Sequence, residues 1–177
     1  IRVVNARHEQ GVAYMAFGYA QSTGKPGVYA VVPGPGILNT TAALSTAYAC
    51  NSRVLAITGQ IPSSYIGREL GMLHEIPNQL SVLEGLTKFA KRINYPSDAP
   101  AIVSEAFKNM RSGRPRPTAI EMPMDIMQHK SEVKLRKFTD GYSPPAADPD
   151  LIKEAALILG AATVSYTHLR AHETQPY

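Results

Sequence analysis

The stretch Arg7-His8-Glu9-Gln10-Gly11 lies between a short apolar segment and a helical pattern, and the rest of the chain is arranged around this junction. Residues 1–5 are mostly apolar, which predicts a strand. Apolar side chains then recur at helical spacing through residues 8–21, and the glycine- and proline-containing segment 24–27 predicts the end of this helix. The junction therefore places one carboxylate, Glu9, between a strand and a helix.

The alternation of strands and helices continues beyond this junction. Residues 28–32 are almost entirely apolar, as expected for a parallel strand that is covered on both faces. The pattern predicts an α/β fold, in which a mainly parallel sheet carries helices on both faces. Further strands are expected at 53–58, 87–93 and 117–122, and helices at 39–49, 78–83 and 99–110.

The composition is typical of a soluble globular protein, with 177 residues, 44% apolar and 18% charged residues. No run of about 18 apolar residues is present, so no membrane span is predicted. Cys50 is the only cysteine, which excludes an internal disulfide and fits a reducing, cytoplasmic location. The basic clusters at 111–116 and 130–137 lack interleaved aromatic residues, and no nucleic-acid partner is expected.

Ligands of parallel α/β sheets bind at the carboxyl ends of the strands, so the loops at 6–9, 33–36 and 58–62 are expected to share one edge. Glu9 in the first loop is a candidate functional carboxylate, although the helix macrodipole also favours an acidic residue there. Pro33-Gly34-Pro35-Gly36 has neither a dinucleotide fingerprint nor a Walker lysine. Its prolines remove N–H donors that a phosphate would need, so the loop is either a structural turn or a narrow support for a flat ring.

Two further polar groups are candidates. Thr58-Gly59-Gln60 follows a strand and is either a simple turn or part of the ligand edge. His74-Glu75 is either a local hydrogen-bonded pair or an acid–base group. No Ser-His-Asp arrangement and no Cys/His spacing for a metal is found, so no metal ligand is assigned within this chain.

Taken together and in order, these motifs resemble the pyrimidine-binding domain of thiamine diphosphate-dependent enzymes, within the acetolactate synthase and pyruvate oxidase-like superfamily. The resemblance covers about residues 1–127. It rests on Arg7-His8-Glu9-Gln10-Gly11, Gly18-Tyr19-Ala20, Gly24-Lys25-Pro26-Gly27, Gly34-Pro35-Gly36 with Asn39, Ile57-Thr58-Gly59-Gln60, Thr87-Lys88 and Gly113-Arg114-Pro115.

The resemblance implies a role for each of these cofactor-side residues. Glu9 matches the glutamate that hydrogen-bonds N1′ of the cofactor's aminopyrimidine ring and so promotes proton loss from the thiazolium C2. Pro35, Gly36 and Asn39 match positions that line this ring. A carboxyl in a largely apolar site can keep a proton near neutral pH, which is the state expected for Glu9. The diphosphate and its Mg²⁺ are expected on a separate domain, and the resemblance leaves open whether FAD is also bound.

Departures from the family pattern bear on the substrate. Acetolactate synthases carry a Phe-Gln pair where this chain has His74-Glu75, and a lysine where Pro123-Met124-Asp125 has Met124. Losing a cation near the substrate argues against a true acetolactate synthase. The expected activity is therefore that of another decarboxylase or carboligase of 2-keto acids, a lyase or transferase, with Gln60, His74 and Glu75 on the substrate side. His74 is a candidate acid–base group.

The resemblance further implies a homodimer or homotetramer, because in this family the glutamate reaches a cofactor held mainly by another subunit. A rival interpretation is a non-catalytic binding or assembly module that retains the fold. A Rossmann-type nucleotide-binding protein is a more distant alternative that the missing GxGxxG disfavours.

The expected domain organisation is a pyrimidine-binding domain at 1–127 that lacks its first strand, a linker at 128–150 and the start of a central domain at 151–163. Residues 164–177 resemble the in-frame translation of a transposase-type sequencing adaptor, so they are expected to be non-native. His168 and His172 in this tail are then not a metal-binding pair. The chain is expected to be an inactive fragment of a longer enzyme.

Overall fold

The structure is a computed structural model that describes residues 2–135 and 144–162. The chain divides into two compact units, residues 1–142 and 143–177, which are described separately. The first unit contains the sheet and its covering helices, and within the described residues the second contains one helix.

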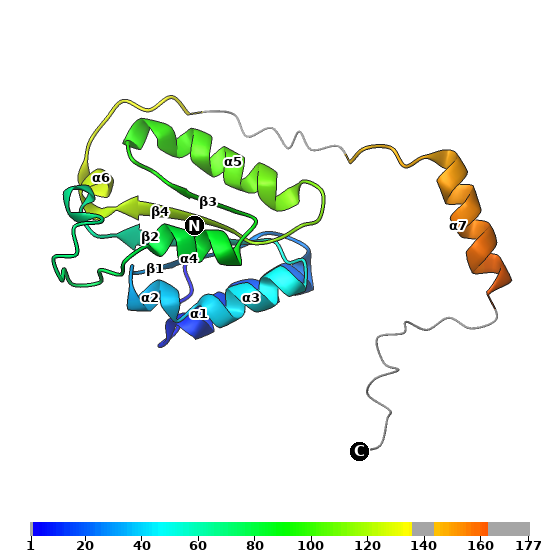
Figure 1. The fold of residues 1–177 in the computed structure, drawn as a ribbon, viewed down its shortest axis with the longest axis horizontal. Helices are drawn as coiled ribbons and strands as arrows, with labels where there is room; N and C mark the ends of the chain where they lie inside the picture. Colours follow the sequence, from blue (N-terminus) through cyan, green and yellow to red (C-terminus); the bar gives the residue numbers. More distant parts are fainter. Residues whose placement is uncertain (1, 136–143, 163–177) are drawn as a thin grey trace, which may run out of the picture. The chain divides into compact units, whose positions relative to one another are not determined.

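Four parallel strands form the sheet of the first unit (Figure 1). They lie in the order β1-β2-β4-β3, so β1 and β3 are edge strands. In the central pair, Leu55 lies beside Thr118 and the register continues to Gln60 beside Pro123. The predicted α/β class with a parallel sheet is confirmed. The strands are β1 (Gly27–Val31), β2 (Val54–Gln60), β3 (Phe89–Arg92) and β4 (Thr118–Pro123).

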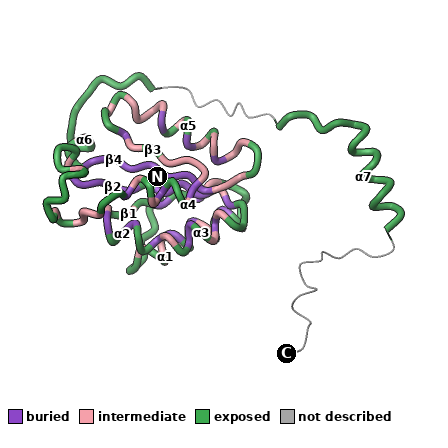
Figure 2. Tube along the Cα trace, viewed as in Figure 1, coloured by how far each residue is buried: buried purple, intermediate pink, exposed green. Residues whose placement is uncertain are grey.

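Helices cover both faces of the sheet. Side chains alternate between the two faces of each strand, so apolar strands present an apolar surface on each face for helices to bury. Val54 and Ala56 belong to the core under one set of helices, whereas Leu55 belongs to the core on the opposite face. The two central strands are accordingly the most continuously buried part of the chain (Figure 2). The first face carries α1 (Glu9–Thr23), α3 (Thr41–Ala49) and α4 (Gln79–Leu86), and the opposite face carries α5 (Ala99–Arg111).

Small residues bring α1 close to the sheet. Ala13, Ala16 and Ala20 form its buried stripe. A Cβ atom at Gly27 would lie 2.0 Å from the carbonyl oxygen of Ala16, so only glycine permits this approach at the start of β1. The close packing fixes the axis of α1, and with it the position of Glu9 at the helix N-terminus.

One face of β1 is less covered than its apolar sequence predicts. Val28 is 49% exposed, and Ile57 on the neighbouring strand is 37% exposed. The reason is that α5 packs on β2, β3 and β4. The expectation that residues 28–32 are covered on both faces is therefore wrong for this chain.

Three local predictions are also corrected. Residues 2–5 form no strand, and Val3 is 76% exposed because these residues pair with no strand of the described sheet. Pro35 and Gly36 begin a short helix, α2 (Pro35–Leu38), since proline is favoured in a first helical turn. Thr58, Gly59 and Gln60 belong to β2 rather than to a turn after it.

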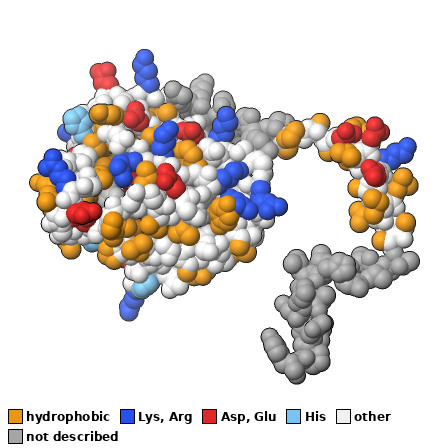
Figure 3. Space-filling view, in the orientation of Figure 1, with side chains coloured by type: hydrophobic (Ala, Val, Ile, Leu, Met, Phe, Trp, Pro, Cys, Tyr) orange, Lys and Arg blue, Asp and Glu red, His pale blue; other side chains and the backbone are white. Residues whose placement is uncertain are grey.

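The remaining elements are short or isolated. The first unit also contains the 3₁₀ helices η1 (Ser63–Tyr65) and η2 (Pro96–Asp98) and the helix α6 (Met124–Gln128). In the second unit, α7 (Pro149–Ala161) is capped by Asp148, whose side chain accepts a hydrogen bond from the N–H of Asp150 at 2.9 Å. Hydrophobic side chains along α7 are exposed, including Leu157 and Leu159 (Figure 3).

The predicted adaptor-like tail at 164–177 lies outside the described residues. Within the two described ranges, no helix combines the length and apolar character needed to cross a bilayer.

Candidate functional site

Glu9 is the first residue of α1. The preceding residue, His8, has extended backbone geometry and caps the helix, because its Nδ1 accepts a hydrogen bond from the N–H of Gln10 at 3.2 Å. Side-chain caps of this kind satisfy N–H groups that have no partner within the helix. The cap fixes where α1 begins and therefore where the Glu9 carboxylate leaves the backbone.

Asn39 holds this carboxylate. Its Nδ2 donates a hydrogen bond to Oε2 of Glu9 at 3.1 Å, across 30 residues of sequence. Asn39 ends α2, so the hydrogen bond joins the helix after β1 to the N-terminus of α1. Two residues that the sequence assigned to the same ring-binding site thus touch each other.

Hydrogen bonds govern the ionisation of Glu9 in this chain. Its own backbone N–H and then the Asn39 amide hold the pKa of the Glu9 carboxyl below its usual value, because both hydrogen bonds favour the charged form. Burial acts in the opposite direction but is outweighed, since Glu9 remains partly exposed. This direction applies to the chain by itself, and the retention of a proton in a completed cofactor site stays a prediction.

Gly36 allows the backbone of α2 to pack tightly against Val32, with Glu9 at ordinary contact distance. A Cβ atom at this position would lie 2.5 Å from Cγ2 of Val32 and 3.9 Å from Cγ of Glu9. Pro35, at the start of α2, is exposed, and its missing N–H costs no helical hydrogen bond there. The structure thus places Pro35 and Gly36 on the same short helix that ends at Asn39.

A pocket of about 280 Å³ opens at Glu9, and we call it the Glu9 pocket. The Glu9 carboxylate and apolar side chains at the end of β1 contribute to its wall. This donor set suits a flat, largely apolar ring that carries a polar nitrogen at one edge. The lining residues are Asn5, Ala6, Arg7, His8, Glu9, Val12, Ala30, Val31 and Val32.

Gly34 is constrained on two sides. Its φ of 61° lies in the left-handed region that favours glycine, and a Cβ atom would lie 2.4 Å from the carbonyl oxygen of His74. On its other side, its N–H donates to Oε1 of Gln79 at 2.8 Å. Contacts on both sides thus hold the turn before α2 in place, and a larger residue at position 34 would displace this turn.

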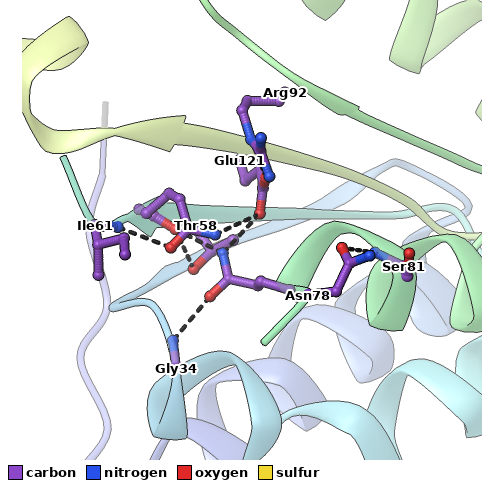
Figure 4. Close-up of polar contacts among 10 residues, drawn as sticks. Gly34, Thr58, Ile61, Asn78, Ser81, Arg92 and Glu121 are labelled. Carbon is purple, nitrogen blue, oxygen red and sulfur yellow. Dashed lines mark hydrogen bonds and ion pairs between the residues drawn. The ribbon is translucent and has the colours of Figure 1, made fainter. Parts of the chain in front are cut away.

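Gln79 belongs to a buried polar cluster that the sequence did not reveal (Figure 4). Its Nε2 donates to Oε2 of Glu121 at 2.8 Å and to the carbonyl oxygen of Gly59 at 2.9 Å. Glu121 is fully buried and accepts a hydrogen bond from Nε of Arg92 at 2.5 Å. We call the group formed by Gly34, Gly59, Gln60, Gln79, Arg92 and Glu121 the Glu121 network.

The predicted substrate-side residues make contacts within the protein. Gln60 is buried and belongs to the Glu121 network, with its Oε1 accepting from the N–H of Ile61 at 2.8 Å. His74 has a φ of 70° and contacts Gly34 through its backbone carbonyl. Glu75 accepts a hydrogen bond from the N–H of Met72 at 2.8 Å, which is a local contact.

The segment Pro123-Met124-Asp125 lies at the end of β4. Ser63 donates to the Asp125 carboxylate from its hydroxyl at 2.5 Å and from its N–H at 2.9 Å. The hydroxyl contact holds the pKa of Asp125 below its usual value, so this residue stays ionised at neutral pH. Met124 is 50% exposed. The segment therefore presents a thioether and a fixed anion at this edge.

Within residues 2–135 and 144–162, no three His, Cys, Asp or Glu side chains are grouped as ligands for a metal ion.

The chain is similar to proteins that use thiamine pyrophosphate. Residues 1–82 match the family model described as thiamine pyrophosphate enzyme, N-terminal TPP binding domain. An acetolactate synthase of Arthrospira platensis is 43% identical over 164 residues, which are 89% of this chain and 28% of that protein. The large subunit of acetolactate synthase isozyme 1 of Escherichia coli is 32% identical over 163 residues, 92% of this chain and 28% of that protein.

A third relative is named for a different activity. The Pseudomonas aeruginosa protein named Probable 2-ketoarginine decarboxylase AruI is 39% identical over 127 residues, which are 72% of this chain and 23% of that protein. The chain thus spans about a quarter of the length of these relatives.

Proposed function

The chain belongs, through its pyrimidine-binding domain, to the family of thiamine diphosphate-dependent enzymes, and we propose that Glu9 activates the cofactor in an enzyme acting on a 2-keto acid. When bound, thiamine diphosphate supplies the carbon nucleophile and the electron sink that decarboxylation of a 2-keto acid requires. The contribution of this chain is to bind the pyrimidine end of the cofactor and, through Glu9, to hold one proton at the ring nitrogen.

The observation that carries the proposal is the hydrogen bond from Asn39 to Glu9 at the Glu9 pocket. This hydrogen bond orients the Glu9 carboxylate through the Asn39 amide, and the pocket beside the carboxylate remains open. The carboxylate is ionised in the chain alone, because hydrogen bonding lowers its pKa. Covering it with an aromatic ring and further protein removes water, and desolvation then raises the pKa toward proton sharing with the ring nitrogen.

The substrate is proposed to be a 2-keto acid other than that of a true acetolactate synthase. Met124 stands where acetolactate synthases carry a lysine, and the neighbouring Asp125 is ionised, which disfavours a second carboxylate-bearing substrate beside these two residues. The reaction is then a decarboxylation or carboligation. His74 is proposed as a substrate-side acid–base group, together with Glu75 and Gln60, once a longer protein completes the site.

The cofactor's diphosphate and a Mg²⁺ ion are proposed to bind a domain of that longer protein outside residues 1–127, and FAD binding is left open. We also propose a homodimer or homotetramer in the cytoplasm. These statements rest on the family resemblance and on the short stretch of the relatives that the chain covers.

Turnover by the full-length protein tests the proposal. Glu9→Gln keeps the size of the side chain and an oxygen that accepts from Asn39, but it cannot hold the proton. With thiamine diphosphate and Mg²⁺, its kcat on a panel of 2-keto acids should fall by about 10²–10⁴-fold. Glu105→Gln is the matched control, since Glu105 forms an exposed ion pair with Lys91 at 3.2 Å on α5. A wild type that neither binds the cofactor nor turns over any 2-keto acid would favour the non-catalytic module instead.

A further inference from the structure

We propose that Gln79 is a positioning residue for the cofactor site, because it holds the Gly34 turn from which α2 and Asn39 extend toward Glu9. This inference rests on the proposed function for its ligand, but its contacts are independent of Glu9. The side-chain hydrogen bonds of Gln79 go to Gly34, Gly59 and Glu121, none of which lines the Glu9 pocket, so Gln79 acts through Gly34.

The Gln79 amide has a defined orientation. Its Nε2 has two N–H groups, which go to the carbonyl oxygen of Gly59 at 2.9 Å and to Oε2 of Glu121 at 2.8 Å. Both partners are acceptors, so a reversed amide would set its oxygen against two oxygens. The amide oxygen therefore points to the N–H of Gly34 at 2.8 Å. Gln79 is 1% exposed, so water cannot readily replace these bonds.

Glu121 is anchored in the sheet, and this makes Gln79 a rigid support. The carboxylate is fully buried in central strand β4 and is paired with Arg92 on edge strand β3 at 2.5 Å (Figure 4). A buried carboxylate with an ion-pair partner and a second donor has little freedom to move. The hydrogen bonds through Gln79 and Glu121 therefore fix the position of Gly34 relative to β4 and β3.

The path from Gly34 to Glu9 is short and hydrogen-bonded throughout. The N–H of Leu38 donates to the carbonyl oxygen of Gly34 at 3.1 Å, and the N–H of Asn39 donates to that of Pro35 at 3.0 Å. Asn39 then contacts Glu9 at 3.1 Å. A displacement of Gly34 therefore moves the amide that orients the Glu9 carboxylate.

Gln79→Met tests the inference, because methionine keeps the length of the side chain and removes all three hydrogen bonds. Asn78→Ala is the matched control on the neighbouring residue. Asn78 caps α4 by accepting from the N–H of Ser81 at 3.2 Å, so its loss destabilises the same helix without reaching Gly34. Gln79→Asn is the second variant, which retains an amide but is one methylene too short to reach Gly34.

Two readouts separate positioning from stability. Hydrogen exchange of the Gly34 N–H in this chain should be slow in the wild type, unchanged within twofold in Asn78→Ala, and faster by about tenfold in Gln79→Met and Gln79→Asn. In the full-length protein, the Gln79 variants should weaken thiamine diphosphate binding by at least about fivefold. Asn78→Ala should lower the melting temperature yet leave this affinity within twofold.

The inference is overturned if the wild-type Gly34 N–H exchanges rapidly. It is also overturned if the Gln79 variants bind the cofactor like the wild type, or if Asn78→Ala at the same loss of melting temperature weakens binding equally. Failure of the proposed function would look different. In that case the wild-type full-length protein would not bind thiamine diphosphate, while exchange at Gly34 would still respond to Gln79.

Discussion

Two glutamates near the carboxyl end of the sheet are each held by a side-chain amide, but their surroundings differ. Glu9 is partly exposed, is held by Asn39 and faces an open pocket. Glu121 is fully buried, is held by Gln79 and has its charge balanced by Arg92. Both carboxylate oxygens of Glu121 already have partners within the protein. Glu9, in contrast, lies at a surface where a ligand can still bind. The comparison distinguishes a carboxylate that supports the site from one that can perform its chemistry.

The largest effect is expected from removing the partner of the buried glutamate. Arg92→Met leaves the Glu121 charge unpaired in the interior and should lower the free energy of unfolding by about 3 kcal/mol. Lys91→Met is the control, because the Lys91–Glu105 pair is about half exposed and such pairs contribute about 0–1 kcal/mol. Urea denaturation of the chain measures both. Equal losses in the two variants would show that Glu121 does not depend on its ion pair.

A smaller loss is expected at the turn that joins the two regions. Gly34→Ala combines a φ of 61° with a Cβ atom 2.4 Å from the carbonyl oxygen of His74, and should cost about 2–3 kcal/mol. Gly67→Ala has a similar φ of 77° but no atom within 4 Å of the added Cβ, so only about 1 kcal/mol of backbone strain is expected. Denaturation midpoints provide the comparison. A loss at Gly67 as large as that at Gly34 would refute the close contact with His74.

The smallest effect concerns the ionisation of Glu9. Asn39→Ala removes one of the hydrogen bonds that lower the Glu9 pKa, so the pKa should rise toward its ordinary value in an NMR titration of the side-chain carboxyl. A lowered folded-state pKa contributes stability above the unfolded value, and this contribution disappears as the pH falls through the folded value. The stability difference between wild type and Asn39→Ala that arises from this shift should therefore be present at neutral pH and vanish in acid. An unchanged Glu9 pKa would contradict the contact.

The sequence predicted the class of the fold because its signals are local. Alternating strand and helix patterns were sufficient for the parallel sheet. Glu9 was a candidate from its place between a strand and a helix, but its predicted role came only from the family motifs taken together. Gln79 and Arg92 carry no local signal, because their contacts with Glu121 form only when α4, β3 and β4 meet. An acidic residue inside the apolar run of β4 was the one available hint, because a buried carboxylate requires a partner.

The error about β1 has a physical cause. The coverage of this strand depends on which helices pack against it, and the apolar character of its sequence does not specify that. The substrate-side role of Gln60 stays a prediction, and in this structure its side chain belongs to the Glu121 network. The division at 127 and 150 remains a prediction, and the two compact units of the structure meet after residue 142.

The central claim is that Glu9 promotes the loss of the proton from C2 of bound thiamine diphosphate. It is tested most directly by the rate of deuterium exchange at C2 in the full-length protein, with the cofactor and Mg²⁺ but without substrate. Glu9→Gln should slow this exchange by about 10²–10⁴-fold relative to wild type, while Glu105→Gln should leave it unchanged. Equal exchange rates in the wild type and Glu9→Gln, with the cofactor bound in both, would contradict the account.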